Sequence, residues 1–196
     1  MSINEYFRDW SKALDLKQVQ NTATSLGKES KKAFEFFHLC PYNNLRVVML
    51  MDNSQIFQQP YLDILRESFI SLEVPHNHTI FDTSLEKWCR QGVLPLYCEL
   101  SNKHGKDSVN QVWNSFVKSL FISLSKRHTA IIYLLIGPLA QTLRSYINEQ
   151  FNNVLSVASV EREQDAVTKL KDMWNQTDKL LNAINGYSIQ WYEEYL

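Results

Sequence analysis

The sequence predicts an α/β fold, a three-layer α/β/α sandwich around a central four-stranded, mainly parallel sheet. Four short runs of apolar and β-branched residues alternate with stretches that repeat apolar residues at helical spacing. The runs span 45–51, 93–100, 129–136 and 153–158. Continuous apolar runs are typical of parallel strands, because helices cover both faces of such a sheet. Right-handed crossovers then place the connecting helices on the two sides.

Helices are predicted on either side of these strands. An N-terminal helical region over 4–37 is interrupted at Gly27, a typical helix stop. Further helices are predicted within 57–72 and over 85–90, 108–126, 137–149 and 161–185. The segment 74–83 reads as a polar loop. We expect one domain over 1–196, with 1–44 as its N-terminal helical part, since a chain of this length can bury about 70% of its unfolded surface.

Composition narrows the function classes. With 44% hydrophobic and 21% charged residues, the chain resembles ordinary soluble globular proteins. The net charge of −1 lacks the global basic excess of a nucleic-acid binder. We expect an intracellular, soluble protein, because the N-terminus lacks a signal-peptide core and the longest apolar run, 130–136, is too short to cross a bilayer.

No metal or cofactor is expected. Cys40, Cys89 and Cys98 lack metal-ligand spacing, and we interpret them as buried thiols of a reducing compartment. The pair His76 and His78 has no evident third ligand, which favours a solvated loop over a metal site.

The candidate site follows the first predicted strand. In open α/β sheets the ligand binds just outside the carboxyl ends of the strands. The polar residues Asp52 to Gln55 come directly after the strand over 45–51. We therefore expect the chemistry of the protein to lie there.

Several stretches share their order and spacing with one known family. They are Trp10 to Leu14, Leu45 to Leu50, Trp88-x-x-Gln91-Gly92-Val93-Leu94-x-Leu96, Trp113-x-x-Phe116, Tyr133-Leu134-Leu135-x-Gly137-x-x-Ala140-Gln141, and Asn182, Gly186, Ile189 and Trp191 near the end. Together they resemble the uracil-DNA glycosylase superfamily, in particular its family 1. The resemblance covers most of the chain and implies the α/β/α fold predicted above.

The resemblance is weaker at the residues that carry the chemistry of the family. The family's G-Q-D-P-Y-H loop corresponds to Met51 through Ile56. Its water-activating acid falls on Asn53, and the tyrosine that excludes thymine falls on Gln55. The asparagine that reads the uracil edge falls on Tyr97, whose bulky ring we expect to fill the pocket.

Two further parts of the family's site are also changed. The histidine of its H-P-S-P-L-S loop falls on Ser159, and Glu161 and Glu163 would face DNA phosphates and repel them. The base-stacking phenylalanine corresponds to Phe69 if about three extra residues loop out before it.

These changes favour a catalytically inactive member of the fold that works as a protein-binding adaptor or scaffold, and so a pseudoenzyme. Losing one preorganised donor typically costs about 100- to 1000-fold in rate. Asn53 alone does not exclude catalysis, since other branches of the superfamily carry asparagine there, flanked by glycine and proline that are missing here. Asp52 could replace the acid only through a one-residue shift, which would turn the whole strand over.

Two other functions stay open at this point. One is non-catalytic nucleic-acid binding through a basic strip that includes Lys103, Lys106, Lys126 and Arg127. The other is a divergent DNA glycosylase with altered base specificity, in which Tyr97 shapes the base pocket.

The expected partner is an unidentified protein, with nucleic acid as a second candidate and no membrane. A viral or phage DNA-associated complex is one setting that the resemblance suggests. The aromatic segments 187–195 and 57–61 are either partner surfaces or caps of the core, and we favour caps.

Overall fold

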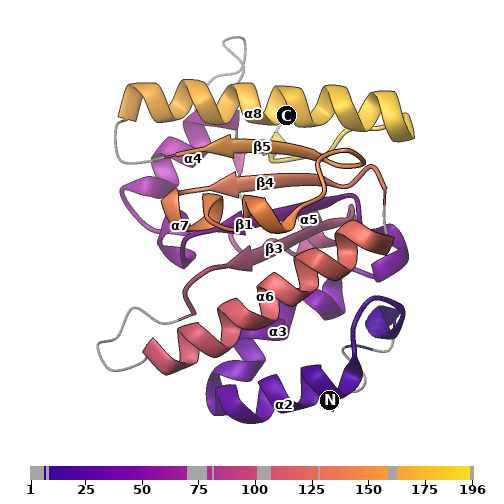
Figure 1. The fold of residues 1–196 in the computed structure, drawn as a ribbon. Coiled ribbons are helices and arrows are strands. Elements are labelled where there is room, and N and C mark those ends of the chain that lie inside the picture. The colour runs from indigo at the N-terminus through magenta and orange to yellow at the C-terminus, as the bar shows by residue number, and fades with distance from the viewer. Residues whose placement is uncertain are drawn as a thin grey trace.

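The central sheet has four strands and is parallel throughout. The computed structural model describes residues 7, 9–69, 79–80, 82–100, 107–127, 129–158 and 163–194. The strands are β1 Val47–Met51, β3 Val93–Tyr97, β4 Ile132–Ile136 and β5 Asn153–Val157. They lie in the order β3-β1-β4-β5, and each neighbouring pair is parallel (Figure 1). The predicted fold class is confirmed, with β1 at the centre of the sheet.

Burial explains why these residues form strands. Every residue of β1, β3 and β4 is buried, as expected of apolar runs covered on both faces. β5 lies at the edge and is largely half-buried, which fits the polar Asn153 and Ser156 within it. Each strand is shorter than its predicted run, because the flanking residues already turn out of the sheet.

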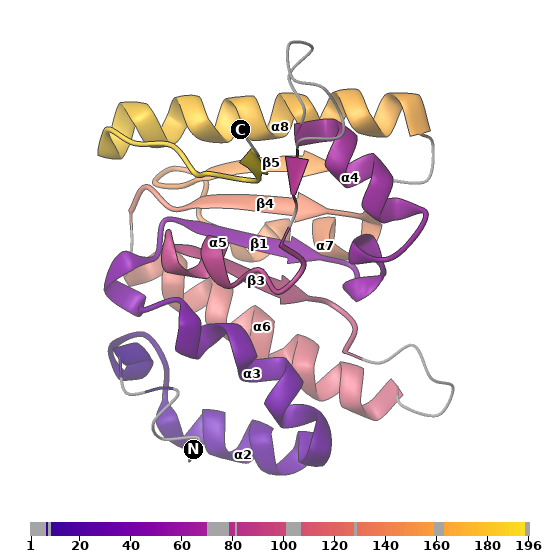
Figure 2. The same ribbon diagram turned by 180° about the vertical axis from the view of Figure 1, so that it is seen from behind.

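Helices cover both faces of the sheet and its two sides. They are η1 Asp9–Lys12, α2 Leu16–Leu26, η2 Gly27–Glu29, α3 Ser30–Leu39, η3 Tyr42–Asn44, η4 Ser54–Phe57, α4 Tyr61–Phe69, α5 Glu86–Arg90, α6 Asp107–Arg127, α7 Pro138–Gln141, η6 Arg144–Tyr146 and α8 Glu163–Asn185. Figure 1 shows α6 and α7 in front of the sheet, and Figure 2, from behind, shows α3, α4 and α5 on the other face. α8 packs on α4 and β5. Among the described residues, every helix is too short or too polar to cross a membrane.

Two predicted segments were wrong in detail. The helix predicted over 137–149 ends at Gln141, and only the short turn η6 follows it. The hydroxyl of Thr142 donates to the carbonyl of Leu139 at 2.6 Å, a local bond that competes with continued helix. In the predicted polar loop, Thr79–Ile80 form strand β2, which pairs antiparallel with β6 Glu193–Glu194. Strands of two residues are too short to show a periodic pattern.

The C-terminal segment is tied to the core by tryptophans. The indole N–H of Trp88 donates to the carbonyl of Trp191 at 2.9 Å, and the indole N–H of Trp191 donates to Asp178 at 3.1 Å. The rings of Trp174 and Trp191 lie 4.9 Å apart. The expectation that the C-terminal aromatic segment caps the core therefore holds for Trp191, which is 5% exposed, whereas Tyr187 is 39% exposed.

The three cysteines are buried and free, as predicted. Burial raises the pKa of the Cys40 thiol to about 12, and it raises the pKa of Cys89 and Cys98 as well. Since the thiolate is the reactive form, these side chains act as small apolar groups of the core.

Replacing Trp191 with alanine is expected to lower the free energy of unfolding by about 3–5 kcal/mol, because a buried ring and its hydrogen bond to Asp178 are lost together. Urea unfolding followed by circular dichroism measures this change. Tyr187→Ala is the matched control, and it should shift the midpoint little because Tyr187 is exposed. Equal effects of the two substitutions would contradict the role of the C-terminal segment as a cap.

Candidate functional site

The carboxyl ends of the four strands meet at one edge of the sheet. Met51 pairs with both Tyr97 and Ile136, and Ile136 pairs with Val157. Backbone bonding continues past the strands, since Cys98 N–H donates to the Met51 carbonyl at 2.8 Å. The residues that follow β1 are therefore held firmly between its two neighbours, as the sequence predicts for a site at this edge.

Asp52 is fixed at this edge through its backbone and its side chain. Its N–H donates to the Ile136 carbonyl at 3.1 Å, and its carbonyl accepts from Glu99 N–H at 2.8 Å. Its carboxylate accepts the backbone N–H of Ala140 in α7 at 2.8 Å. Burial raises the pKa of this carboxyl above its ordinary value, although the N–H groups of Ala140 and Leu139 oppose the rise.

Gly137 gives the Asp52 carboxylate its place, a role that the sequence did not reveal. Gly137 has φ +107°, and an added Cβ would lie 2.3 Å from the Asp52 Cγ. No side chain other than hydrogen fits there. In the sequence, Gly137-Pro138 indicated only a helix start, because the pairing with Asp52 spans 85 positions (137 − 52) and depends on the register of β1 and β4.

Asn53 follows Asp52 and presents its side chain in a loop at the same edge. The Asn53 Oδ1 accepts the backbone N–H of Gln55 at 2.9 Å, which caps η4. Asn53 is half-buried and Gln55 is exposed. The amide oxygen accepts one bond within the loop, so Asn53 can offer its second lone pair and its NH₂ to a water or substrate.

Tyr97 ends β3 and faces the opposite side of the sheet from the Asp52 carboxylate. Its side chain is buried, and its ring centroid lies 6.2 Å from that of Phe36 in α3. Burial raises the pKa of its phenol, and the nearby Glu35 raises it further. Met51 is its partner across the β1–β3 ladder, so the two side chains share one face. Both are almost fully buried, which fills this face at the carboxyl edge.

Phe69, the last residue of α4, lies inside the aromatic core. It is 8% exposed, and its ring lies 4.9 Å from that of Trp174 and is nearly parallel to that of Trp191 at 6.3 Å. Base stacking by Phe69 stays a prediction from the sequence, while in this structure the ring packs on core aromatics. The ring is needed to fill the space between α4, α8 and the C-terminal segment.

Several predicted site residues lie outside the described residues: Ser159, Glu161, Lys103, Lys106, His76 and His78. Lys126 and Arg127 are the last two residues of α6, which leads to the amino end of β4. The part of the predicted basic strip that can be placed is thus remote from the carboxyl edge. Among the described residues, no group of three or more His, Cys, Asp or Glu side chains could hold a metal ion.

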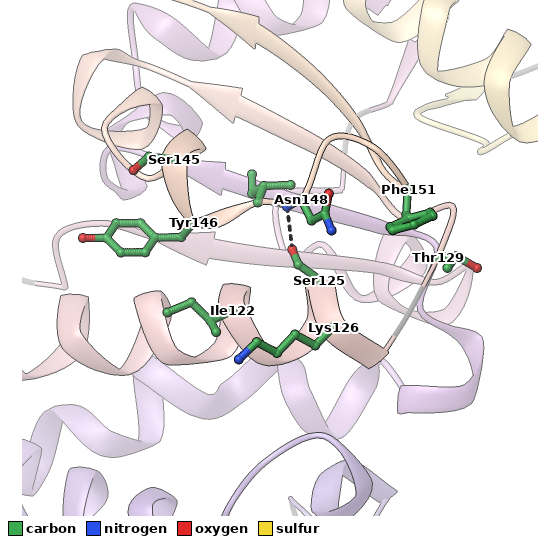
Figure 3. A pocket seen from close by; sticks show the side chains of 9 residues that line it. Ile122, Ser125, Lys126, Thr129, Ser145, Tyr146, Asn148 and Phe151 are labelled. Carbon is green, nitrogen blue, oxygen red and sulfur yellow. Dashed lines mark hydrogen bonds between the residues drawn. The ribbon is translucent and has the colours of Figure 1, made fainter.

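A cavity of about 500 Å³ lies on the α6 face, near the amino ends of β4 and β5 (Figure 3). It is lined by Ile122, Ser125 and Lys126 of α6, by Thr129, and by Ser145 to Asn148 and Phe151. Its floor is held by a bond from the Asn148 N–H to the Ser125 hydroxyl at 3.2 Å. Since it lies at the opposite end of the strands, this cavity is not part of the candidate site.

The pH dependence of stability should report the buried Asp52 carboxyl. Its folded pKa is raised, so the folded state binds more protons than the unfolded state between the two pKa values, and stability falls as pH rises through that range. Relative to Asp52→Asn, the unfolding free energy of the unchanged chain should therefore decrease from about pH 4 towards pH 7. Urea unfolding of both proteins across this range measures the difference. If the unchanged chain instead became more stable than Asp52→Asn as the pH rises, the raised pKa of Asp52 would be refuted.

Comparisons with known proteins identify the fold. No protein-family model matches the chain. The uracil-DNA glycosylase of Mycoplasmopsis pulmonis (strain UAB CTIP) is 26% identical over 180 residues, which cover 81% of this chain and 79% of that protein. The crystal structure of mimivirus uracil-DNA glycosylase superposes with a TM-score of 0.66 at 14% identity, covering 97% of this chain and 87% of that one. A variant of the mimivirus enzyme in complex with UGI gives a TM-score of 0.65 at 13% identity, covering 97% and 89%.

These names contradict one of the predictions from sequence and confirm another. The inactive adaptor, and with it the pseudoenzyme and non-enzyme assignments, is wrong, because the relative and the solved structures are all named as uracil-DNA glycosylases, which points to a DNA glycosylase. The error came from treating changed side chains at the site as proof of lost chemistry. The resemblance itself is confirmed at the level of the fold. The chain therefore has the fold of the uracil-DNA glycosylase superfamily.

Proposed function

We propose that the chain is a DNA glycosylase of the uracil-DNA glycosylase type, with DNA as its partner. One observation carries the proposal: Asn53, at the family's water-activating position, follows the central strand and is held at the carboxyl edge by its bond to Gln55 N–H. The name of the relative at 26% identity supports uracil as the base that is released.

The proposed reaction is hydrolysis of an N-glycosidic bond. A base in duplex DNA must leave the stack before it can reach the site. The oxygen of a water molecule then bonds to the sugar C1′, while the C1′–N1 bond breaks and its electron pair leaves with uracil. The water loses one proton, and uracil gains one, so the products are free uracil and an abasic site in the DNA.

Asn53 would hold the attacking water through its amide oxygen, whose second lone pair can accept the water O–H and leave the water oxygen free to attack. An amide cannot offset the positive charge that develops on the sugar as a carboxylate does, so a slower reaction is expected than with an acid at this position. The resemblance includes branches of the superfamily that carry asparagine here, which supports catalysis without the acid. What Asn53 contributes is position, because its orientation is fixed by the capping bond to Gln55.

Tyr97 and Met51 would set the choice of base. The two side chains lie on one face at the ends of neighbouring strands, and both are buried. A base that enters beside them meets an aromatic ring and a thioether, with the Tyr97 hydroxyl as the hydrogen-bonding group of the pair. We therefore expect selection by size and shape, with Tyr97 as the larger barrier.

Base release is the direct test of the function. The purified chain should convert uracil-containing single- or double-stranded oligonucleotides into alkali-labile products, and Asn53→Ala should lower the rate about 100-fold or more. Asn175→Ala, an exposed asparagine of α8, is the matched control and should leave the rate unchanged. Release no faster than in a blank without protein would refute the proposal.

The selectivity assigned to Tyr97 is tested with two substitutions. Tyr97→Ala should raise the excision of thymine relative to uracil by at least about 10-fold, because it removes the ring that excludes the extra methyl group. Tyr97→Phe keeps the ring and should keep the ratio. Paired rate measurements on uracil and mismatched thymine oligonucleotides give the ratio, and an unchanged ratio in Tyr97→Ala would remove Tyr97 from base selection.

A further inference from the structure

Asp52 is hydrogen-bonded through both its backbone and its carboxylate, although the proposed reaction gives it no role. Its backbone bonds to Ile136 on one side and to Glu99 on the other, at 3.1 and 2.8 Å. Its carboxylate leaves the sheet and accepts the N–H of Ala140 at 2.8 Å. One residue thus joins β1 to both neighbouring strand ends and to the first turn of α7.

The Asp52 carboxylate packs directly on Gly137, where there is no space for a larger side chain. All three carboxylate atoms lie within 2.3–2.5 Å of the place that a Cβ on Gly137 would occupy. The Gly137 N–H donates to the Val157 carbonyl at 2.8 Å, so the glycine cannot move away without breaking a bond to β5. The carboxylate therefore has one orientation, packed on Gly137 and directed at α7.

The contact between the Asp52 carboxylate and Ala140 lies directly before the loop that contains Asn53. On its other side the loop is closed by the bond from Gln55 N–H to the Asn53 Oδ1 at 2.9 Å. Asn53 is therefore held between two capped helical turns, α7 through Asp52 and η4 through its own side chain. Releasing the carboxylate from Ala140 would leave the backbone bonds of Asp52 as the hold on the amino side of Asn53.

We propose that Asp52 is a positioning residue, whose carboxylate caps α7 and thereby fixes the loop that presents Asn53. This inference rests on the proposed function. Asp52 acts through Asn53 and does not itself touch the substrate. Its acceptor oxygen matters here, whereas its negative charge does not, and that distinction can be tested.

The test compares Asp52→Ala with Asp52→Asn. The alanine variant loses the acceptor for Ala140 N–H, and the asparagine variant keeps a carbonyl oxygen in the same place without the charge. We expect kcat for uracil release to fall about 10- to 100-fold in Asp52→Ala with KM within about 3-fold, since misplacement of a catalytic group acts on kcat. Asp52→Asn should restore kcat to within about 3-fold of the unchanged chain.

Asp15→Ala is the matched control, because Asp15 also caps a helix, α2, with a bond from Lys17 N–H at 2.9 Å, but lies far along the chain from the site. It should leave kcat unchanged. A full kcat in Asp52→Ala would overturn the proposal. An equal loss in Asp52→Asn and Asp52→Ala would also overturn it, since the charge would then act in the chemistry itself.

A second measurement does not depend on activity. Amide hydrogen exchange over 53–58 should be faster in Asp52→Ala than in the unchanged chain, and near normal in Asp52→Asn. If the unchanged chain releases no base, the proposed function fails. Amide hydrogen exchange would still show whether the Asp52 carboxylate fixes the loop over 53–58. Exchange that is identical in all three proteins would overturn the positioning role even in an active enzyme.

Discussion

The structure depends on the pairing of β1 with two parallel neighbours. β1 bonds to β3 on one side and to β4 on the other, and all of its residues are buried. This pairing brings the ends of strands from distant parts of the chain to one edge. Because the bonds continue past the strands, through Asp52 and Glu99, the edge is as firmly held as the sheet itself. A polar loop in this position can be both exposed and rigid, which a site for bond hydrolysis requires.

The two faces at this edge have different tasks. On the α7 side, Asp52 packs on Gly137 and holds a helical turn. On the α3 side, Met51 and Tyr97 fill the space beside Phe36. Strand alternation forces this division, because consecutive residues point to opposite faces. Asp52 therefore cannot stand in for an acid at the Asn53 position without turning β1 over, and the structure gives it a different partner.

The expectation of an inactive adaptor shows where reasoning from residue types fails. Replacement of an acid by Asn53 and of an amide by Tyr97 was interpreted as loss of function. The comparisons with known proteins point instead to a DNA glycosylase. Changed residue types alone did not establish an inactive protein, because the effect of a substitution at a site depends on the groups that surround it.

The sequence by itself determined the α/β/α architecture and the polar segment that follows the central strand. The apolar runs that became β1, β3, β4 and β5 carry their own signal, since a strand buried on both faces must be apolar throughout. Asp52 and Asn53 lie at the carboxyl edge, as expected for residues that follow the central strand.

Only the tertiary structure decided which side chains lie together at that edge. The Phe69 ring, a candidate for stacking on a base, belongs to the aromatic core, because α8 and the C-terminal segment close over it. The Asp52 carboxylate meets Gly137 and Ala140 only because β1 and β4 pair in register. Contacts between residues that are distant along the chain leave no periodic trace in it, and for this reason the sequence could predict the strand ends without the geometry of the side chains beside them.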